Sequence, residues 1–109
     1  MPNPYEIVVP LFNDEANFVH LLDSLNEVGV SFDDVVVSMS GPLGNIYTLV
    51  KNYGFRLVYS DKKLTPSEAR NMGAEETTAD YIVFLDSDIL VTQTWKRALD
   101  ETAQKKQEA

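Results

Sequence analysis

Short, uniformly apolar runs alternate with segments of helical periodicity along almost the whole chain. The apolar runs, which we expect to be strands, are residues 7–10, 35–37, 55–59 and 81–85. The expected helices cover residues 14–28, 46–53 and 66–76 and a last segment that begins near Trp95. Apolar strands joined by amphipathic helices are typical of a parallel sheet covered on both faces. With right-handed crossovers, the pattern predicts an α/β fold with a doubly wound, mostly parallel open sheet.

Capping residues and helix breakers mark the ends of these elements. Thr65 and Glu68 have the spacing of a capping box, with proline between them at the first helical position. Gly29 and Gly54 are natural stops for the first two helices. We expect Pro10 to end the first strand, because proline donates no ladder hydrogen bond. The other candidate N-caps are Asn13 or Asp14, and Thr92 or Thr94.

The chain is acidic, with 17 Asp and Glu against nine Lys and Arg and a formal net charge of -8. This balance argues against nucleic acid or an anionic membrane as the main partner, since both require a basic surface. The absence of cysteine excludes disulfides and zinc–thiolate sites. No apolar run can span a bilayer, and the first residues do not resemble a signal peptide, so we expect a cytoplasmic protein.

The length of 109 residues indicates a single domain. We expect this domain to cover residues 1–103. The remaining residues, 104–109, are polar and are predicted to form a frayed tail.

The fourth apolar run ends in two carboxylates, in the sequence Asp86-Ser87-Asp88. Side chains two residues apart on extended backbone point the same way, so we expect Asp86 and Asp88 to converge on one cation. Hard divalent ions such as Mg²⁺ or Mn²⁺ prefer oxygen ligands of this kind. By itself the same sequence also describes a polar turn after a strand.

Other polar residues are expected at the same edge of the sheet. In doubly wound sheets, ligands bind beyond the carboxyl ends of the strands, where the strand order reverses. The polar residues that follow the predicted strands are Asn13, Asp14, Ser38, Ser40, Asp86 and Asp88. The sequence therefore predicts a ligand site at this edge.

Three segments resemble motifs of the inverting, family-two nucleotide-sugar glycosyltransferases. Pro10-Leu-Phe-Asn-Asp-Glu15 resembles their Pro-x-Tyr-Asn-x-Glu, and Ser67-Glu-Ala-Arg-Asn-Met-Gly73 resembles their Ser-x-Ala-Arg-Asn-x-Gly helix. Phe84-Leu-Asp-Ser-Asp88 resembles their strand-terminal Asp-x-Asp, and Trp95 resembles a tryptophan that often follows it. The resemblance covers roughly residues 5–100 and implies the nucleotide-binding half of a GT-A fold, which is Rossmann-like.

The resemblance also implies roles for individual residues. Asp88 would hold the metal, Mn²⁺ or Mg²⁺, that bridges the diphosphate, and Asp86 would contact the ribose or the metal shell. Arg70 would lie near the base or the phosphates. The nucleotide-sugar-binding residues implied in this way are Pro10, Leu11, Phe12, Asn13, Arg70 and Asp86, and the metal ligands are Asp86 and Asp88. A divalent cation stabilises the charge that develops on a diphosphate leaving group.

The chain departs from the family pattern in two places. The second strand of the family typically ends in Asp-Asp-Gly-Ser, where an Asp reads the base, whereas this chain has Val37-Ser-Met-Ser-Gly41. Family members are also considerably longer, and the half after Asp-x-Asp binds the acceptor and supplies the general base. We therefore expect a domain that binds a nucleoside-diphosphate sugar for glycosyl transfer, without turnover on its own and with no assignable catalytic residue.

Two other classes of protein are weighed against this interpretation. A non-catalytic binding or assembly module is favoured by Ser38 and Met39, which replace the acidic motif. A receiver-like signalling domain is suggested by Asp14 and Glu15, which mimic its first acidic pair. The rest of the receiver pattern does not follow.

Several prominent residues have simpler structural explanations. Arg70 is as readily explained by an ion pair with Asp86 or Glu68 as by a ligand contact. We expect His20 at the surface or rim and Lys62 and Lys63 in a solvated loop. Phe18 and Trp95 are expected in the core. The turn at 41–44 lacks the spacing of a dinucleotide-binding loop.

The strand at 81–85 carries a prediction about assembly. In the parent fold it is internal and pairs with a strand from the later half. Here it would be an unpaired apolar edge, which promotes association between chains. We expect a homodimer in which this strand or the Trp95 helix meets its symmetry mate.

Overall fold

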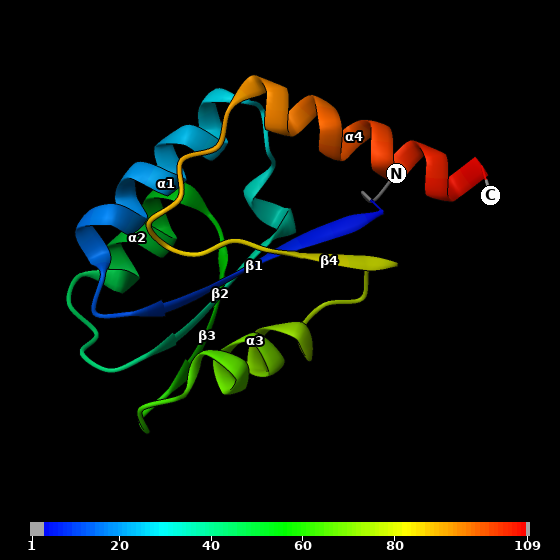
Figure 1. Ribbon diagram of the computed structural model, residues 1–109. Coiled ribbons are helices and arrows are strands. Elements are labelled where there is room, and N and C mark those ends of the chain that lie inside the picture. Colours follow the sequence, from blue (N-terminus) through cyan, green and yellow to red (C-terminus); the bar gives the residue numbers. More distant parts are fainter. Residues whose placement is uncertain (1–3, 109) are drawn as a thin grey trace.

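The computed structural model describes residues 4–108, with side chains as far as residue 105. The chain alternates between strands and helices in the predicted order (Figure 1). The elements are β1 (Tyr5–Phe12), α1 (Glu15–Glu27), the short 3-10 helix η1 (Phe32–Asp34), β2 (Val35–Ser40), α2 (Ile46–Tyr53), β3 (Arg56–Ser60), α3 (Pro66–Ala74), β4 (Tyr81–Phe84) and α4 (Gln93–Glu108).

The four strands form one parallel sheet in the order β3-β2-β1-β4. Figure 1 shows α1, α2 and α4 on one side of the sheet and α3 on the other. The doubly wound α/β prediction is therefore confirmed. The strand order reverses between β1 and β4, which places the expected ligand crevice between them. A receiver-like sheet has the order 2-1-3-4-5, so the receiver alternative is wrong.

β1 continues two residues past Pro10, so the predicted end of this strand is wrong. Pro10 pairs with Ser38 in the β2 register. The Val8 carbonyl accepts a hydrogen bond from the Leu85 N–H on the β4 side, at 3.1 Å. Backbone groups two residues apart face the same neighbour, so the Pro10 nitrogen also faces that side. The β1–β4 pairing has already ended at Val8–Phe84, so proline removes no existing ladder bond.

The helix boundaries follow the predicted caps in most places. Gly29 and Gly54 have positive φ angles of 85° and 91° and follow α1 and α2 closely. Thr92 caps α4, since its hydroxyl accepts the Trp95 N–H at 3.1 Å. α3 ends at Ala74, earlier than expected. The predicted tail from residue 104 is helical as far as residue 108, and the domain boundary stays a prediction.

The core lies between the middle of the sheet and α1. All of β2 is buried. The largest fully buried side chains include Phe18, Ile7, Leu21, Leu22, Leu25 and Ile46. Phe18 is a core residue as predicted, and Trp95 is half-buried against the same cluster. His20 is exposed, as expected. This core fixes β1 and α1, the two elements that bracket the first motif.

On the opposite face, α3 packs unusually close to the sheet. A Cβ at Gly73 would lie 2.5 Å from Val8 Cγ1 and 3.2 Å from Ser38 Cβ. Only glycine allows this approach without displacing the buried Val8. The predicted capping box is present, because Glu68 N–H donates to Thr65 Oγ1 at 3.2 Å and Thr65 N–H to Glu68 Oε1 at 2.9 Å. These contacts set both the distance and the start of α3.

β4 forms one edge of the sheet and has β1 as its neighbour. α4 is fastened to the amino ends of these two strands. The Tyr5 hydroxyl donates to Asp100 Oδ1 at 3.2 Å, and the Tyr81 hydroxyl donates to the Ala103 carbonyl at 3.0 Å. Phe84, at the other end of β4, is 45% exposed.

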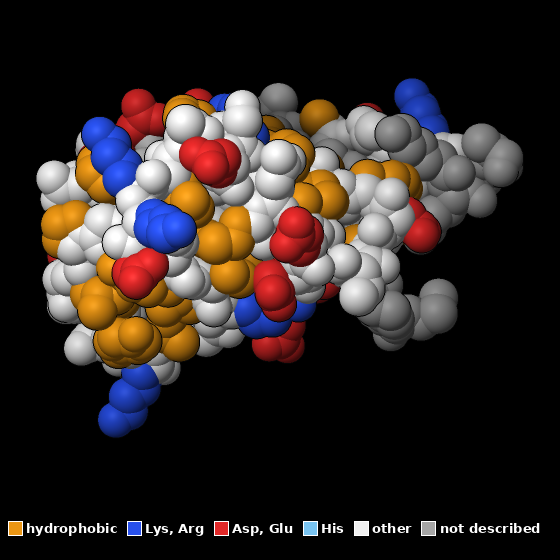
Figure 2. Space-filling model, turned by 90° about the horizontal axis from the view of Figure 1, so that it is seen from below, with side chains coloured by type: hydrophobic (Ala, Val, Ile, Leu, Met, Phe, Trp, Pro, Cys, Tyr) orange, Lys and Arg blue, Asp and Glu red, His pale blue; other side chains and the backbone are white. Residues whose placement is uncertain are grey.

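Charged side chains of both signs lie on the surface (Figure 2). Figure 2 shows acidic and basic side chains interspersed among apolar ones on the face seen from below. Within the part of the chain that the structure describes, no helix is both long and apolar enough to cross a membrane.

We predict that Gly73→Ala destabilises the protein by about 1–3 kcal/mol, because the added methyl overpacks a filled core position. Urea unfolding of the purified variant measures this loss. Asn71→Ala, on an exposed position of the same helix, is the matched control and should leave stability almost unchanged. Equal stability of Gly73→Ala and wild type would contradict the close approach of α3 to β1.

Candidate functional site

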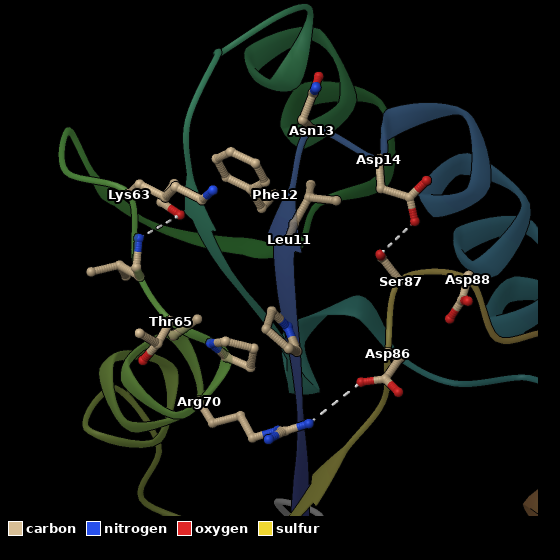
Figure 3. Close-up of a pocket in the computed structure, with 15 residues that line it drawn as sticks. Leu11, Phe12, Asn13, Asp14, Lys63, Thr65, Arg70, Asp86, Ser87 and Asp88 are labelled. Atoms are coloured by element: carbon tan, nitrogen blue, oxygen red, sulfur yellow. Dashed lines mark hydrogen bonds and ion pairs between the residues drawn. The ribbon is translucent and has the colours of Figure 1, made fainter.

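A pocket of about 630 Å³ opens at the carboxyl ends of the strands, next to the crevice between β1 and β4 (Figure 3). Its lining comes from the end of β1, the start of α3 and the turn after β4. It includes all seven predicted site residues: Pro10, Leu11, Phe12, Asn13, Arg70, Asp86 and Asp88. The structure thus brings together residues from three separate segments of the sequence.

The β1–α1 turn forms one wall of the pocket. Asn13 bends the chain from strand to helix with φ 48°, a left-handed conformation that Asn tolerates better than most residues. The turn leaves Phe12 42% exposed beside the pocket. The Lys63 amine lies 5.0 Å from the centre of its ring, within the range of a cation–π interaction. For Lys63 we preferred a solvated loop over a phosphate contact, and the structure places it in this loop at the border of the site.

The β3–α3 loop forms the second wall. Ser40, at the end of β2, accepts the Leu64 N–H at its hydroxyl oxygen (3.3 Å), which ties this loop to the sheet. The capped first turn of α3 follows directly, and Thr65 and Pro66 line the pocket. Arg70 lies one turn further along α3. The capping box therefore determines where Arg70 stands relative to the pocket.

The turn after β4 carries the two carboxylates. β4 ends at Phe84, and the Ile89 N–H donates to the Asp86 carbonyl at 3.2 Å. Our premise that Asp86 and Asp88 sit on extended backbone is therefore wrong, because the chain already turns here. In Figure 3, Asp86 points toward Arg70, and Asp88 extends from the far end of the turn. Both carboxylates still border the pocket.

Arg70 and Asp86 form an ion pair with an N–O distance of 3.7 Å. This is one of the two structural pairings that the sequence suggested for Arg70. Their side chains are 40% and 62% exposed. A long ion pair exposed to water contributes little to stability, and its partners can exchange for others. Both groups are thus available to a charged ligand.

A hydrogen bond that the sequence did not predict joins the two sides of the crevice. The Ser87 hydroxyl donates to Asp14 Oδ2 at 2.8 Å. Asp14 was expected at this edge, but as a free polar residue or a cap. It occupies the N-cap position of α1 without capping through its side chain. No local pattern reveals such a contact, because 73 positions separate the two residues.

The carboxylates suit a metal that a ligand also helps to hold. Within the described residues, no group of three or more His, Cys, Asp or Glu side chains is arranged to hold a metal ion. Mg²⁺ is usually bound by one or two protein carboxylates together with water and substrate phosphates. Asp86 and Asp88 meet this requirement as a pair. The donor set therefore fits a cation bound jointly with a phosphorylated ligand.

The end of β2 contributes little to the pocket. Ser38 and Met39 are buried, and neither is among the residues that line the pocket. Ser38 Oγ has no hydrogen-bond partner among the described residues. Ser40 is the β2 residue that lines the pocket. The end of β2 therefore offers the pocket a hydroxyl, at the place where the family pattern has an acidic side chain.

Comparison with known proteins agrees with this arrangement. The sequence profile described as glycosyl transferase family 2 matches residues 6–109. The chain belongs to glycosyl transferase family 2.

Two curated relatives support this assignment. The amylovoran biosynthesis glycosyltransferase AmsB of Erwinia amylovora is 31% identical, and the match covers 77% of this chain and 30% of the relative. An uncharacterized glycosyltransferase of Rickettsia bellii is 32% identical, with 77% and 13% of the two chains covered. This family-2 chain thus spans less than a third of the length of either relative.

Solved structures of similar fold are GT-A glycosyltransferases. S. aureus TarS (residues 1-349) has a TM-score of 0.74 at 22% identity, covering 88% of this chain and 31% of TarS. Glucosyl-3-phosphoglycerate synthase from Mycobacterium tuberculosis, in complex with UDP, has a TM-score of 0.63 at 25% identity, with 79% and 34% covered. The family-2 chain therefore has the partial GT-A fold that its motifs implied.

We predict that the first turn of α3, beside the pocket, weakens in acid. The Thr65 N–H that donates to Glu68 holds the pKa of this carboxyl below its ordinary value of 4.5. A lowered pKa stabilises the fold above pH 4.5, and this contribution disappears as the pH falls through the folded-state pKa. Urea unfolding at a series of pH values should therefore show the advantage of wild type over Glu68→Gln shrinking below pH 4.5.

Glu75→Gln, which neutralises an exposed carboxylate at the far end of α3, is the control for net charge. If the difference between wild type and Glu68→Gln stays constant with pH, the charged capping box does not stabilise α3.

Proposed function

We propose that this domain binds a nucleoside-diphosphate sugar, together with Mn²⁺ or Mg²⁺, as the donor-binding part of a glycosyltransferase. The observation that carries the proposal is the convergence of three segments on one pocket. The Pro10–Asn13 wall, Arg70 on α3 and the Asp86–Asp88 turn all line it. The pocket lies at the carboxyl edge of a doubly wound sheet, where such folds bind their ligands.

The two ends of the pocket differ in chemistry, which suggests how the ligand lies. At one end, the exposed ring of Phe12 offers a flat apolar surface with the Lys63 amine above it. A nucleobase can stack on such a surface. At the other end, Arg70 stands opposite Asp86 and Asp88. The guanidinium and a cation held by the carboxylates would neutralise a diphosphate between them.

The metal, when bound, would act as a Lewis acid on the diphosphate leaving group. Asp86 and Asp88 would hold it, and Arg70 would leave its long contact with Asp86 for a phosphate oxygen. The Pro10–Asn13 wall and the β3–α3 loop would orient the nucleoside. Residues that bind the acceptor and activate it are not assigned to this chain.

Related structures support the choice of nucleotide. The neighbouring glucosyl-3-phosphoglycerate synthase was solved in complex with Mn²⁺, UDP and phosphoglyceric acid, and also with Mg²⁺ and UDP. TarS was solved in complex with UDP-GlcNAc. We therefore propose a uridine diphosphate sugar as the first candidate donor. Separately, we propose that the protein is located in the cytoplasm.

A second candidate function is a non-catalytic binding or assembly module. The observation that favours it is the end of β2, where Ser38 and Met39 are buried and Ser40 presents only a hydroxyl. A site without an acidic group at this position binds a base less selectively. In this case the domain would act through its surface rather than through a nucleotide.

Calorimetric titration with UDP- and GDP-sugars, with and without Mn²⁺, tests the first function. We predict binding that requires Mn²⁺ and that Asp88→Asn weakens by at least about tenfold, because loss of a metal ligand costs no less than loss of a residue that orients one. Asp80→Asn is the matched control, since Asp80 is exposed at the opposite end of β4. It should bind like wild type. Absence of heat from wild type under every condition would favour the assembly module.

We also propose that the domain forms a homodimer through the free edge of β4. Tyr81 and Leu85 donate their N–H groups toward β1, at 3.2 and 3.1 Å. The intervening Ile82 and Phe84 therefore direct their backbone groups away from the sheet. Within the described chain, no strand pairs with this edge. Unpaired strand edges of apolar sequence readily pair with another chain.

Light scattering should therefore report a dimer for wild type and a monomer for Phe84→Lys, since a lysine on an edge strand opposes pairing. Tyr47→Lys replaces an apolar side chain on α2 that is 63% exposed, and this control should stay dimeric. A wild-type protein that remains monomeric at high concentration would disprove the edge interface.

A further inference from the structure

Two residues at variable positions of the motifs are bonded to each other across the crevice. Asp14 is the second of the two unspecified residues in the Pro-x-Tyr-Asn-x-Glu pattern, and Ser87 is the middle residue of Asp-x-Asp. We propose that Asp14 and Ser87 form a positioning pair, which holds the carboxylate turn, residues 86–89, against the start of α1. This inference rests on the proposed function, because it concerns how the metal-binding carboxylates are placed.

The carboxylate turn has few other attachments. It starts directly after its last attachment to the sheet, the Leu85 N–H that donates to the Val8 carbonyl at 3.1 Å. Its own hydrogen bond, from the Ile89 N–H to the Asp86 carbonyl, does not join it to another element. The contact of Asp86 with Arg70 is long and exposed to solvent. The next attachment is the Val91 N–H, which donates to Ser24 Oγ at 3.1 Å.

The hydrogen bond between Ser87 and Asp14 is stronger than these contacts, because its acceptor is a carboxylate and because it is partly buried. The hydroxyl donates to a charged carboxylate at 2.8 Å, and the pair is partly buried. Hydrogen bonds to ionised acceptors are roughly twice as strong as those between neutral groups. The pair therefore determines the position of the turn more firmly than the Arg70 contact does.

Asp14 is itself held in place. Its carbonyl accepts the Phe18 N–H at 3.0 Å, which joins it to the first turn of α1. Its Oδ1 atom accepts a hydrogen bond from the side-chain amide of Asn17 (Nδ2) at 2.8 Å, which leaves Oδ2 for Ser87. The N-terminal end of a helix also favours a carboxylate electrostatically. Each of its two oxygens accepts a protein donor, which is the arrangement of an orienting group.

The consequence for the site follows from the position of Ser87. It lies between Asp86 and Asp88, so a fixed position of Ser87 also fixes the backbone from which both carboxylate side chains extend into the pocket region. Loss of the bond should let the turn move and should weaken metal-dependent binding by about tenfold, the lower end for residues that orient metal ligands.

The first test needs no ligand. Amide hydrogen exchange, followed by NMR, reports the order of the turn through the Ile89 N–H. We expect faster exchange of this amide in Ser87→Ala and Asp14→Ala, and wild-type exchange in Ser87→Thr, which retains the hydroxyl. Ser31→Ala removes a hydroxyl that accepts the Asp33 N–H in another exposed turn, and it serves as the control.

The second test measures UDP binding in the presence of Mn²⁺ by the same set of variants and by the Asp14→Ala, Ser87→Ala double variant. If both residues act through one bond, the double variant should lose no more affinity than either single variant. The affinity should recover in Ser87→Thr and stay unchanged in Ser31→Ala.

The outcomes separate this inference from the proposed function. Wild-type binding that Ser87→Ala leaves intact would overturn the positioning pair alone. Unchanged Ile89 exchange in Ser87→Ala would also overturn it. No binding of UDP and Mn²⁺ by wild type would overturn the proposed function and, with it, the role of the pair toward a ligand. Additive losses in the double variant would show that the two residues act separately.

Discussion

The pairing of β1 with strands on both of its sides is the constraint on which the rest of the structure depends. β1 is parallel to β2 and to β4, so the carboxyl ends of all three strands reach the same edge. α1 covers β1 on one face and α3 covers it on the other, and this packing fixes its register, because a shift of one residue would exchange the side chains that face the two helices. The Pro10–Asn13 wall is the end of β1 itself. Arg70 and the carboxylate turn are positioned by α3 and β4, which both contact β1.

Most of the fold was predictable because its signals are local. Strand and helix periodicity, the Thr65–Glu68 box and the stops at Gly29 and Gly54 each depend on residues within one element. The errors arose where a neighbouring element decides the outcome. Pro10 remains in β1 because of the side that its nitrogen faces, and the backbone at Asp86 turns because β4 has already left the sheet. Neither condition can be read from adjacent residues.

The candidate site shows the same division. The motif residues were found because the order of three short patterns indicates the family, and the fold then brings them to one pocket. Ser87 was not predicted as a member of the site and Lys63 was preferred in a solvated loop, since each contacts a residue far away in the sequence. A contact of this kind depends on how two loops meet. Its signal is absent from any single segment of the sequence.

Proline at the tenth position also governs how far the crevice can close. Its nitrogen faces the side on which β4 departs, and a residue with an N–H there would have a donor directed at the receding chain. Such a donor favours one more hydrogen bond between β1 and β4. That bond would draw the segment after Leu85 onto β1 and fill the space that the pocket occupies. Proline thus ends the pairing of the two neighbouring strands, because it has no N–H to donate, and it preserves the opening between them.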